Sequence, residues 1–366
     1  MPNAANTTID LMADCLEGLR VVDLSRNLPG PFATRLLADL GADIVKIEPE
    51  NGDPARALGG LFEALNHGKT TEKVNFRDPA GIQAIKDHLK DADVMLDSFR
   101  PGVLKGMGLD AETLHALNPK LVIVSILGYG AAASTDASVA INHDWADKAG
   151  HDINFMAMSG VLDQLKTAKG EQAMPNMQFA DLAGGSDTAV IALLAAMFAA
   201  QRTGKGRHIA ISMTHSLYNH MVMPKVTGDL VKSFSGTNPP PQHDFLGGLL
   251  PCYRLYKTSD DRYIAVGSLE LKFWQGLCEV LGLPELKNKH WQLGVMPNMP
   301  DSKEAAKQVK ETFASQPLSH WTEAFAAADV CVTPVLTLEE AKAHPLFAHQ
   351  DSHQTTPGWK VISSVG

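Results

Sequence analysis

Three consecutive segments near the start of the chain, LRVVDLS (19–25), PFATRLLADLG (31–41) and ADIVKIE (42–48), alternate between two hydrophobic patterns. The first and third are short apolar runs rich in β-branched residues, as in buried strands, whereas the second has the apolar spacing of an amphipathic helix. A strand, a helix and a strand in this order predict a parallel pair, because parallel neighbours need a crossover connection. The fold class that this pattern indicates is α/β.

The same alternation continues further along the chain. DPAGIQAIKDHLKDA (78–92) predicts a helix, DVMLDSF (93–99) a strand, residues 110–119 a short helix and KLVIVSILGYG (120–130) another strand. Such a series indicates a parallel sheet covered by helices on both faces. The turn after the first strand is RNLPGP (26–31), which lacks the GxGxxG fingerprint, and this argues against NAD or FAD.

The second half of the chain has a different organisation. Residues 183–201 predict a helix that is apolar on nearly every side, hence one buried within or between subunits. It is predicted to stop at RTGKGR (202–207), where Gly204 and Gly206 can take the positive φ that ends a helix. SGTNPPPQHD (235–244) is the clearest linker, because consecutive prolines fit neither a helix nor a central strand. After it, YRLYKT and RYIAVGS flank SDD and predict a β-hairpin. We therefore expect a second, smaller α+β domain at 225–315.

Composition excludes one class of partner. The 366 residues include 41 acidic and 32 basic side chains, a formal net charge of −9, so no general attraction to nucleic acid is expected. A phosphate-bearing ligand must then be held by local cations. With 45% hydrophobic residues, the chain is long enough to bury a large core and to form two domains.

Targeting and redox signals are few. The opening MPNAANTTIDLMADC has no basic region followed by an apolar run, so it does not resemble a secretory signal. The stretch 189–200 is too short and too rich in alanine to span a bilayer. We therefore expect a cytoplasmic or organelle-matrix protein with no membrane partner and no bound metal. The four cysteines, too widely spaced for a zinc site or a disulfide framework, are Cys15, Cys252, Cys278 and Cys331.

Two residues can supply acid/base chemistry of different charge type: His151 in AGHDINF (149–155) and Asp181 in FADLAGG (179–185). Proton exchange at one carbon by two bases needs such groups on opposite faces of the substrate, one removing a proton and the other delivering one. The residues alone also allow a simpler interpretation. A histidine after Ala-Gly can cap a helix or lie at the surface, and an aspartate before Leu-Ala-Gly-Gly can be an N-cap.

These two strings and several others resemble the α-methylacyl-CoA racemase branch of the class III CoA-transferase family. GPFATRLLADLGADIVKIE (30–48), SFRPGVL (98–104), RTGKGRHIAISM (202–213) and DVCVTPVLTLEEAKAHP (329–345) occur in the same order as in that family. The resemblance covers most of the chain. It implies a Rossmann-like large domain at 1–224, to which 316–366 return, and two chains interlocked as a homodimer.

The resemblance also implies a reaction, racemisation at the α-carbon of a 2-methylacyl-CoA, in which CoA is part of the substrate and no separate cofactor is needed. His151 and Asp181 match the residues that exchange acid and base roles, and Glu270 in AVGSLELKFW matches the glutamate that orients the histidine. Asp152 also fits the catalytic pattern, with a helix cap as the alternative. Backbone amides at a helix start can stabilise the enolate oxygen, and Asp181 lies at such a start.

Local cations are needed for the CoA phosphates. Lys69 in NHGKTT and Arg100 in SFRPGV match family strings, and Arg26 and Gly150 complete the predicted CoA contacts; solvated surface cations are the alternative for both Lys69 and Arg100. The chain also departs from the family, which commonly has arginines where this sequence has Pro49 and Thr70. The cations available to replace them are Lys46, Arg56 and Lys73.

The acyl pocket is predicted less closely. AAASTDASVAINHDWADK (131–148) is longer than the usual family link and enters directly above the proposed site. It contains a second His-Asp pair, 143–144, which without a further ligand at metal spacing is interpreted as loop. Methionines suggest an adaptable apolar wall, with core filling as the alternative; they are Met156, Met158, Met174 and Met177.

Two other functions compete with racemisation. In CoA transfer on the same fold, the aspartate that aligns with Asp181 is a nucleophile that forms a mixed anhydride and then a thioester. His151 argues against this, because the transferase branch has an aromatic residue there, and FLGGLLPCY (245–253) lacks the glycine loop of that branch. A CoA-binding relative without catalysis is the third hypothesis. It is supported by the missing arginines and opposed by His151, Asp181 and Glu270.

Overall fold

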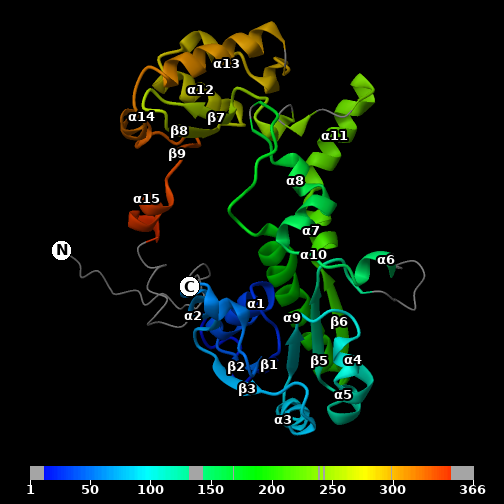
Figure 1. Ribbon diagram of the computed structural model, residues 1–366. Coiled ribbons are helices and arrows are strands. Elements are labelled where there is room, and N and C mark those ends of the chain that lie inside the picture. The colour runs from blue at the N-terminus through cyan, green and yellow to red at the C-terminus, as the bar shows by residue number, and fades with distance from the viewer. Residues whose placement is uncertain are drawn as a thin grey trace, which may run out of the picture. The chain divides into compact units, whose positions relative to one another are not determined.

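The computed structural model describes residues 12–131, 143–167, 169–237, 240–241, 244–297 and 299–347. These residues form two compact units (Figure 1). The first unit contains the residues up to 162 together with 175–220, and the second contains 163–174 and 221–347.

Six parallel strands form the sheet of the first unit, in the order β3-β2-β1-β4-β5-β6. Val22 of β1 lies opposite Val45 of β2 on one side and Met95 of β4 on the other. This order is that of the doubly wound dinucleotide-binding fold, whose ligands bind at the carboxyl ends of the strands where the order reverses. The predicted α/β class with a parallel sheet is confirmed. The strands are β1 (Arg20–Asp23), β2 (Asp43–Pro49), β3 (Thr70–Val74), β4 (Val94–Asp97), β5 (Val122–Leu127) and β6 (Arg207–Ser212).

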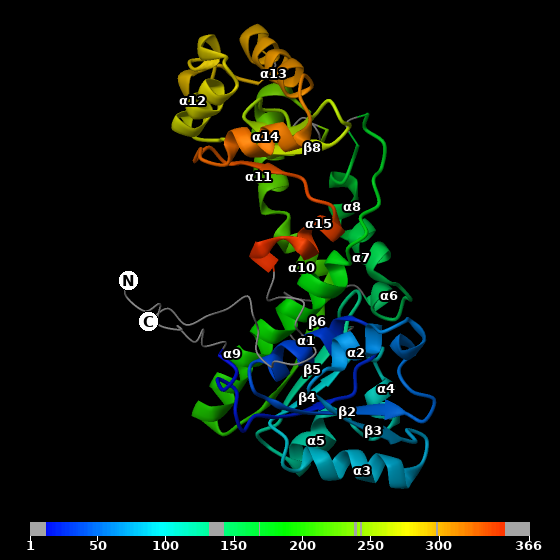
Figure 2. The same ribbon diagram turned by 90° about the vertical axis from the view of Figure 1, so that its left-hand side faces the viewer.

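Helices cover both faces of this sheet, with α1 (Pro29–Asp39) and α9 (Thr188–Thr203) on one side and α3 (Pro79–Leu89) and α5 (Ala111–Leu117) on the other (Figure 2). Ile85 and Leu89 of α3 are fully buried in a core with Val22 and Met95. Burial of such side chains stabilises each packed pair of elements. The other helices of this unit are α2 (Leu61–Asn66), α4 (Val103–Gly106), α6 (His143–Ala146), α7 (Asp152–Ser159) and α10 (Met213–His220), and α8 (Val161–Gln164) crosses into the second unit.

The turn between β1 and α1 is tight. A Cβ atom at Gly30 would lie 2.1 Å from the Ser25 side chain, so only glycine fits. Asn27 adopts a positive φ of 67°, which asparagine tolerates better than most residues, and its N–H donates to Asp53 Oδ1 at 3.1 Å. This turn takes the place of the glycine-rich loop of dinucleotide-binding proteins.

The apolar helix is longer than the sequence predicts. It begins with a π-helical segment, η3 (Ala180–Asp187), continues as α9 and ends at Gly204, whose φ of 70° confirms the predicted stop. Residues 180–203 are long and apolar enough to cross a membrane by length and composition alone, which is weak evidence, and α9 packs against β5 and β6. It is not buried all round in the single chain, because Ile191 and Phe198 are exposed.

The second unit contains a three-stranded antiparallel sheet in the order β7-β8-β9. The predicted hairpin is confirmed, with Asp261 at a φ of 61° in its turn. Trp274 and Phe313 are fully buried in the core of this unit, and the Trp274 Nε1–H donates to the Leu286 carbonyl at 2.8 Å. The elements are β7 (Tyr253–Lys257), β8 (Tyr263–Gly267), β9 (Val332–Pro334), α11 (Val222–Ser235), α12 (Leu271–Val280), α13 (Pro300–Phe313), α14 (Leu318–Phe325) and α15 (Leu338–Ala343).

The unit boundaries differ from the predicted domains. The chain leaves the first unit at 162–163 and again at 220–221, the latter four residues before the predicted boundary at 224–225, and residues 163–174 belong to the second unit. The return to the first unit, expected from 316, does not occur among the described residues. Trp321 and Phe325 are part of the second unit's core, and β9 pairs with β8.

Candidate active site

A pocket of about 990 Å³ opens at the carboxyl ends of the strands of the first unit. This is the edge at which ligands bind in doubly wound sheets, and the volume is in the range of cofactor and ligand sites. Its lining includes residues that follow each of the six strands in turn: Arg26 and Asn27, Glu50 and Asn51, Asn75 to Arg77, Ser98 to Pro101, Gly128, and Met213.

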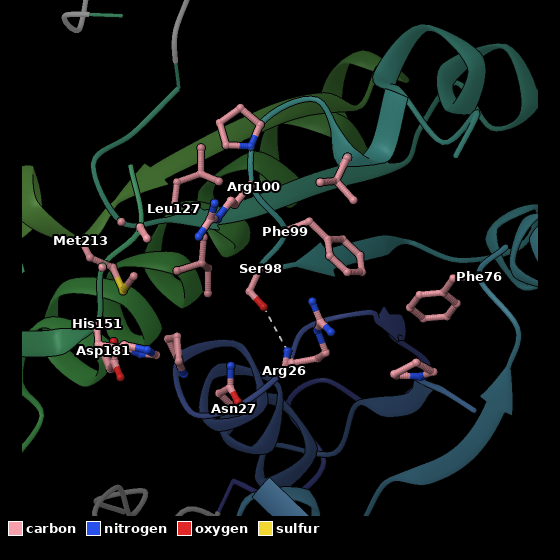
Figure 3. A pocket seen from close by; sticks show the side chains of 18 of the residues that line it. Arg26, Asn27, Phe76, Ser98, Phe99, Arg100, Leu127, His151, Asp181 and Met213 are labelled. Carbon is pink, nitrogen blue, oxygen red and sulfur yellow. Dashed lines mark hydrogen bonds between the residues drawn. The ribbon is translucent and has the colours of Figure 1, made fainter. Parts of the chain in front are cut away.

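Three arginines line this pocket, each soon after the end of a strand: Arg26 after β1, Arg77 after β3 and Arg100 after β4. Arg26 and Arg100, predicted as CoA contacts, are thereby placed in one cavity (Figure 3). Arg77 was missed because it follows β3, a strand that was not predicted, at the same edge of the sheet as the other two. Guanidinium groups suit phosphate because they donate two parallel hydrogen bonds.

Aromatic rings form a flat part of the pocket wall. Phe76 and Phe99 meet edge to face with centroids 6.1 Å apart, and the Arg26 guanidinium lies 5.3 Å from the Phe99 ring centroid. The Arg26 N–H donates to Ser98 Oγ at 3.0 Å, the bond drawn in Figure 3. Arg26 is therefore held by its backbone and by the ring beneath its side chain.

His151 and Asp181 also line this pocket, and Figure 3 shows them at the same end of it. His151 is the N-cap residue of α7, in an extended conformation, and its N–H donates to Asn154 Oδ1 at 3.0 Å. The side chain is exposed and free to meet a ligand. His151 therefore agrees with both interpretations. It is the N-cap residue of a helix, as the simpler interpretation predicts, and it lines the pocket, as the catalytic interpretation requires.

Asp181 lies in the first turn of η3 and is largely buried. Burial raises the pKa of its carboxyl, and the nearby charge of Asp152 raises it further, to about 7. A carboxyl with a pKa in this range can hold or release a proton near neutral pH, which is what a general acid/base needs. Asp181 is not the N-cap of its helix; that residue is Phe179, which provides no side-chain cap bond.

Asp152 is placed differently from the other candidates. Among the described residues, it does not line the pocket. Its Oδ1 accepts the N–H of Ala180 at 2.7 Å and of Asp181 at 3.0 Å. The helix-cap alternative is therefore the one observed, but the helix that Asp152 caps is η3 and not its own.

The predicted contact of Lys69 with CoA phosphate is wrong. Its ammonium group is fully buried and forms an ion pair with Asp23 Oδ2 at 3.3 Å. It also donates to the Pro31 carbonyl at 2.8 Å, to Thr34 Oγ1 at 2.7 Å and to Asn66 Oδ1 at 2.9 Å. Every donor of this lysine is used inside the unit, so it holds the β1–α1 turn in place instead of binding a ligand.

The proposed replacement cations are not in the pocket either. Lys46 is fully buried, donates to the Ser25 carbonyl at 2.8 Å and lies 3.2 Å from Asp53. Arg56 donates to both oxygens of Glu48, at 2.6 and 2.8 Å. Thr70 begins β3, at the end of the strand opposite the pocket, whereas Pro49 itself lines the pocket, as does Arg77.

Gly150 lines the pocket and supports its wall. A Cβ atom there would lie 2.6 Å from the Phe155 ring and 3.0 Å from the Tyr129 hydroxyl, so any other residue would displace these rings. Of the long segment before it, 132–142 and the side chains of 143–144 lie outside the described residues. Lys148 lines the pocket with its ammonium 4.1 Å from the Trp145 ring centroid.

The acyl wall also differs from prediction. None of the four methionines proposed for it is among the residues that line this pocket, whereas Met213 and Met107 are.

Glu270 belongs to the second unit, where it is the N-cap residue of α12 and its carbonyl accepts the N–H groups of Phe273 and Trp274. Its orienting role toward His151 stays a prediction.

Comparison with known proteins identifies the family. The sequence profile of CoA-transferase family III matches residues 16–361. Alpha-methylacyl-CoA racemase of Homo sapiens is 32% identical over 332 residues, which cover 90% of this chain and 80% of that protein. Succinyl-CoA:glutarate CoA-transferase of Homo sapiens is 30% identical over 347 residues, covering 91% and 74%.

A solved structure agrees with the sequence comparison. A CAIB/BAIF family protein from Brucella suis superposes with a TM-score of 0.73 at 26% identity, covering 93% of this chain and 88% of that one. The fold, the pocket at the carboxyl edge of the sheet and the profile match lead to one assignment: the chain belongs to CoA-transferase family III.

Proposed function

We propose that the protein inverts the α-carbon of 2-methylacyl-CoA thioesters by two-base proton transfer. The observation that carries this proposal is that His151 and Asp181 line one pocket together with three arginines. The pocket therefore combines two proton-transfer groups of different charge type with cations suited to phosphate. The relatives include both a racemase and a CoA-transferase, so it is the pair of residues that favours racemisation.

These two groups account for both proton transfers of the reaction. One of them takes the α-proton from one face of the substrate, and the electron pair of the broken C–H bond moves to the thioester oxygen as an enolate. The other then delivers a proton to the opposite face, and the C–H bond re-forms with inverted configuration. Because the pKa of Asp181 is raised to about 7, first by burial, its carboxyl can be the acid in one direction and the base in the other.

The enolate oxygen needs hydrogen-bond donors. The amides at the start of η3, expected to serve, are occupied, because Ala180 and Asp181 both donate to Asp152. The start of α7 remains. The N–H groups of Asp152 and Ile153 are in its first turn, where no intrahelical acceptor exists, and His151 directly precedes them. We assign the thioester oxygen to this helix start.

The arginines are assigned to the CoA phosphates, and a kinetic prediction follows. Arg77→Ala and Arg100→Ala should each raise KM for acyl-CoA with little change in kcat, because a contact far from the reacting carbon stabilises substrate and transition state alike. Lys73→Ala is the matched control, since this exposed lysine of β3 does not line the pocket. The measurement compares acyl-CoA with the thioester that lacks the 3′-phosphate. Equal increases in KM for both variants with both thioesters would exclude both arginines from contact with that phosphate.

CoA transfer by the same aspartate is the competing function, and what leaves the enzyme separates the two. A single 2-methylacyl-CoA epimer, incubated with no acceptor acid, should convert to an equilibrium mixture of both epimers, which chiral chromatography measures. A transferase would require a carboxylate acceptor and would form a covalent bond to Asp181 that hydroxylamine cleaves. Inactivation by hydroxylamine in the presence of acyl-CoA, with CoA appearing on an added acid, would contradict racemisation.

A further inference from the structure

Asp152 connects the two proton-transfer residues of the candidate site. It is the neighbour of His151 in the chain, and its side chain binds the backbone of Asp181. It follows His151 directly in the chain, so α7 positions both residues. Through one oxygen, Oδ1, it also accepts the N–H groups of Ala180 and Asp181, which are 28 and 29 positions away. A helix start is usually capped by the residue just before it. Here the N-cap residue of η3 provides no cap bond, and a residue of another helix takes its place.

The same contact brings two carboxyl groups together. A like charge nearby disfavours ionisation, as burial does. Burial first, and the charge of Asp152 second, raise the pKa of Asp181 to about 7. The pKa of Asp152 is also raised by burial, although its two backbone hydrogen bonds oppose the shift. Hydrogen bonds from the N–H groups of Ala180 and Asp181 favour the charged form of Asp152, so Asp152 carries the negative charge and Asp181 holds the proton.

Several charged and titratable groups lie on the other elements packed against η3. Those with partners of their own are Arg35 with Asp39 on α1, His215 with Ser212 and His220 with Ser216 on α10, Arg202 over Phe198 on α9, and His208 with Ser125 on β6. Arg207, also on β6, is exposed, and Asp187, on η3 itself, interacts electrostatically with His220. Beside burial, Asp152 is the group that acts on the Asp181 carboxyl.

We propose that Asp152 is a positioning residue, whose carboxylate anchors the backbone that carries Asp181 and whose charge keeps the proton on the Asp181 carboxyl. The proposal rests on the proposed function, because it explains how a carboxyl can deliver a proton near neutral pH. It assigns the Asp152 side chain no contact with the substrate. One residue thus sets the distance between the two proton-transfer groups and the pH range in which they share a proton.

Asp152→Asn separates the two parts of this role, because the amide oxygen still accepts both N–H groups while the charge is removed. A shared proton gives a bell-shaped pH profile of kcat/KM, whose apparent pKa values belong to the pair. In Asp152→Asn the bell should move to lower pH by about one unit, the order of a neighbouring charge's effect, for both epimers. Asp152→Ala should show the same shift and in addition a lower melting temperature.

The matched control is Asp187→Asn, which removes another acid of the same helix whose pKa burial also raises and which should leave the pH profile in place. An unchanged profile in Asp152→Asn, or a shift to higher pH, would overturn the proposal.

A second readout does not depend on racemisation. Carboxyl carbon NMR of the full chain, with Asp181→Asn to assign the signal, should show the Asp181 titration midpoint falling in Asp152→Asn. A midpoint that does not move would refute the role of Asp152 even if racemisation were confirmed. A midpoint that falls in a protein that racemises nothing would refute the proposed function alone.

Discussion

Replacing His151 by alanine or Asp181 by asparagine is expected to lower racemisation of a 2-methylacyl-CoA by at least about a hundredfold, the lower end of what a general acid/base group contributes. Each variant keeps the pocket but loses one of the two groups that line it. The measurement is the initial rate of epimerisation for both epimers, with acyl-CoA binding measured in parallel. Binding should be nearly unchanged, because the arginines that we assign to the CoA phosphates are untouched.

The fold should survive both substitutions. His151 is exposed, so its loss removes little packing. Asp181 is ionised in the folded protein only above a pKa of about 7, higher than its ordinary value, so its ionisation opposes folding progressively above the ordinary pKa and fully above about pH 7. Asp181→Asn should therefore be at least as stable as the native chain at pH 8. Near-normal turnover in either pure, folded variant would contradict the assignment of the pair.

Lys69→Met is expected to lower the free energy of unfolding by about 3–5 kcal/mol, the cost of removing one partner of a buried ion pair. The substitution leaves Asp23 buried without the ammonium that lies 3.3 Å from it. Burial alone would raise the pKa of Asp23, but the charges of Lys46 and Lys69 and the hydroxyls of Ser25 and Thr34 lower it to about 2. The anion is therefore present at all ordinary pH values and must be stabilised.

Urea unfolding, followed by hydrogen exchange of the β1 and β3 amides, measures this change in the first unit. Lys73→Met is the control, since Lys73 is an exposed lysine of β3, the strand that follows Lys69, and surface changes of this kind alter stability by less than about 0.5 kcal/mol. Adding Asp23→Asn to Lys69→Met should recover part of the loss. A stable Lys69→Met protein with a raised KM for acyl-CoA would restore the phosphate role that the structure excludes.

The sheet was predictable because its signals are local. Strands β1, β2, β4 and β5 each include a short apolar run, and helix patterns separate them, so their order could be followed along the sequence. Strand β3 (Thr70–Val74) is polar and was not predicted. The end of the long helix was equally local, since Gly204 has the positive φ that its position predicts. The start was not, because η3 is capped by Asp152 from a distant helix.

The errors concern long-range pairing. A lysine after glycine in NHGKTT has the local signature of a surface cation, and only the fold brings Lys69 next to Asp23, 46 positions away. Arg77 was missed because it follows β3 (Thr70–Val74), whose polar sequence TTEKV does not indicate a strand, so its place beside Arg26 and Arg100 was not expected. The predicted return of the chain to the first unit from 316 was wrong for a related reason. The pairing of β9 with β8 cannot be inferred from the sequence of either strand alone. The interlocked homodimer stays a prediction.

The exchange of the α-hydrogen in D2O, followed separately for each epimer, tests the two-base claim most directly. The native protein should place one deuterium at the α-carbon of the product as configuration is lost. His151→Ala and Asp181→Asn should each still exchange one epimer without inverting it, and the two variants should act on opposite epimers, because each retains the base on one face. Deuterium-free epimerisation, or loss of exchange on the same epimer in both variants, would contradict the account.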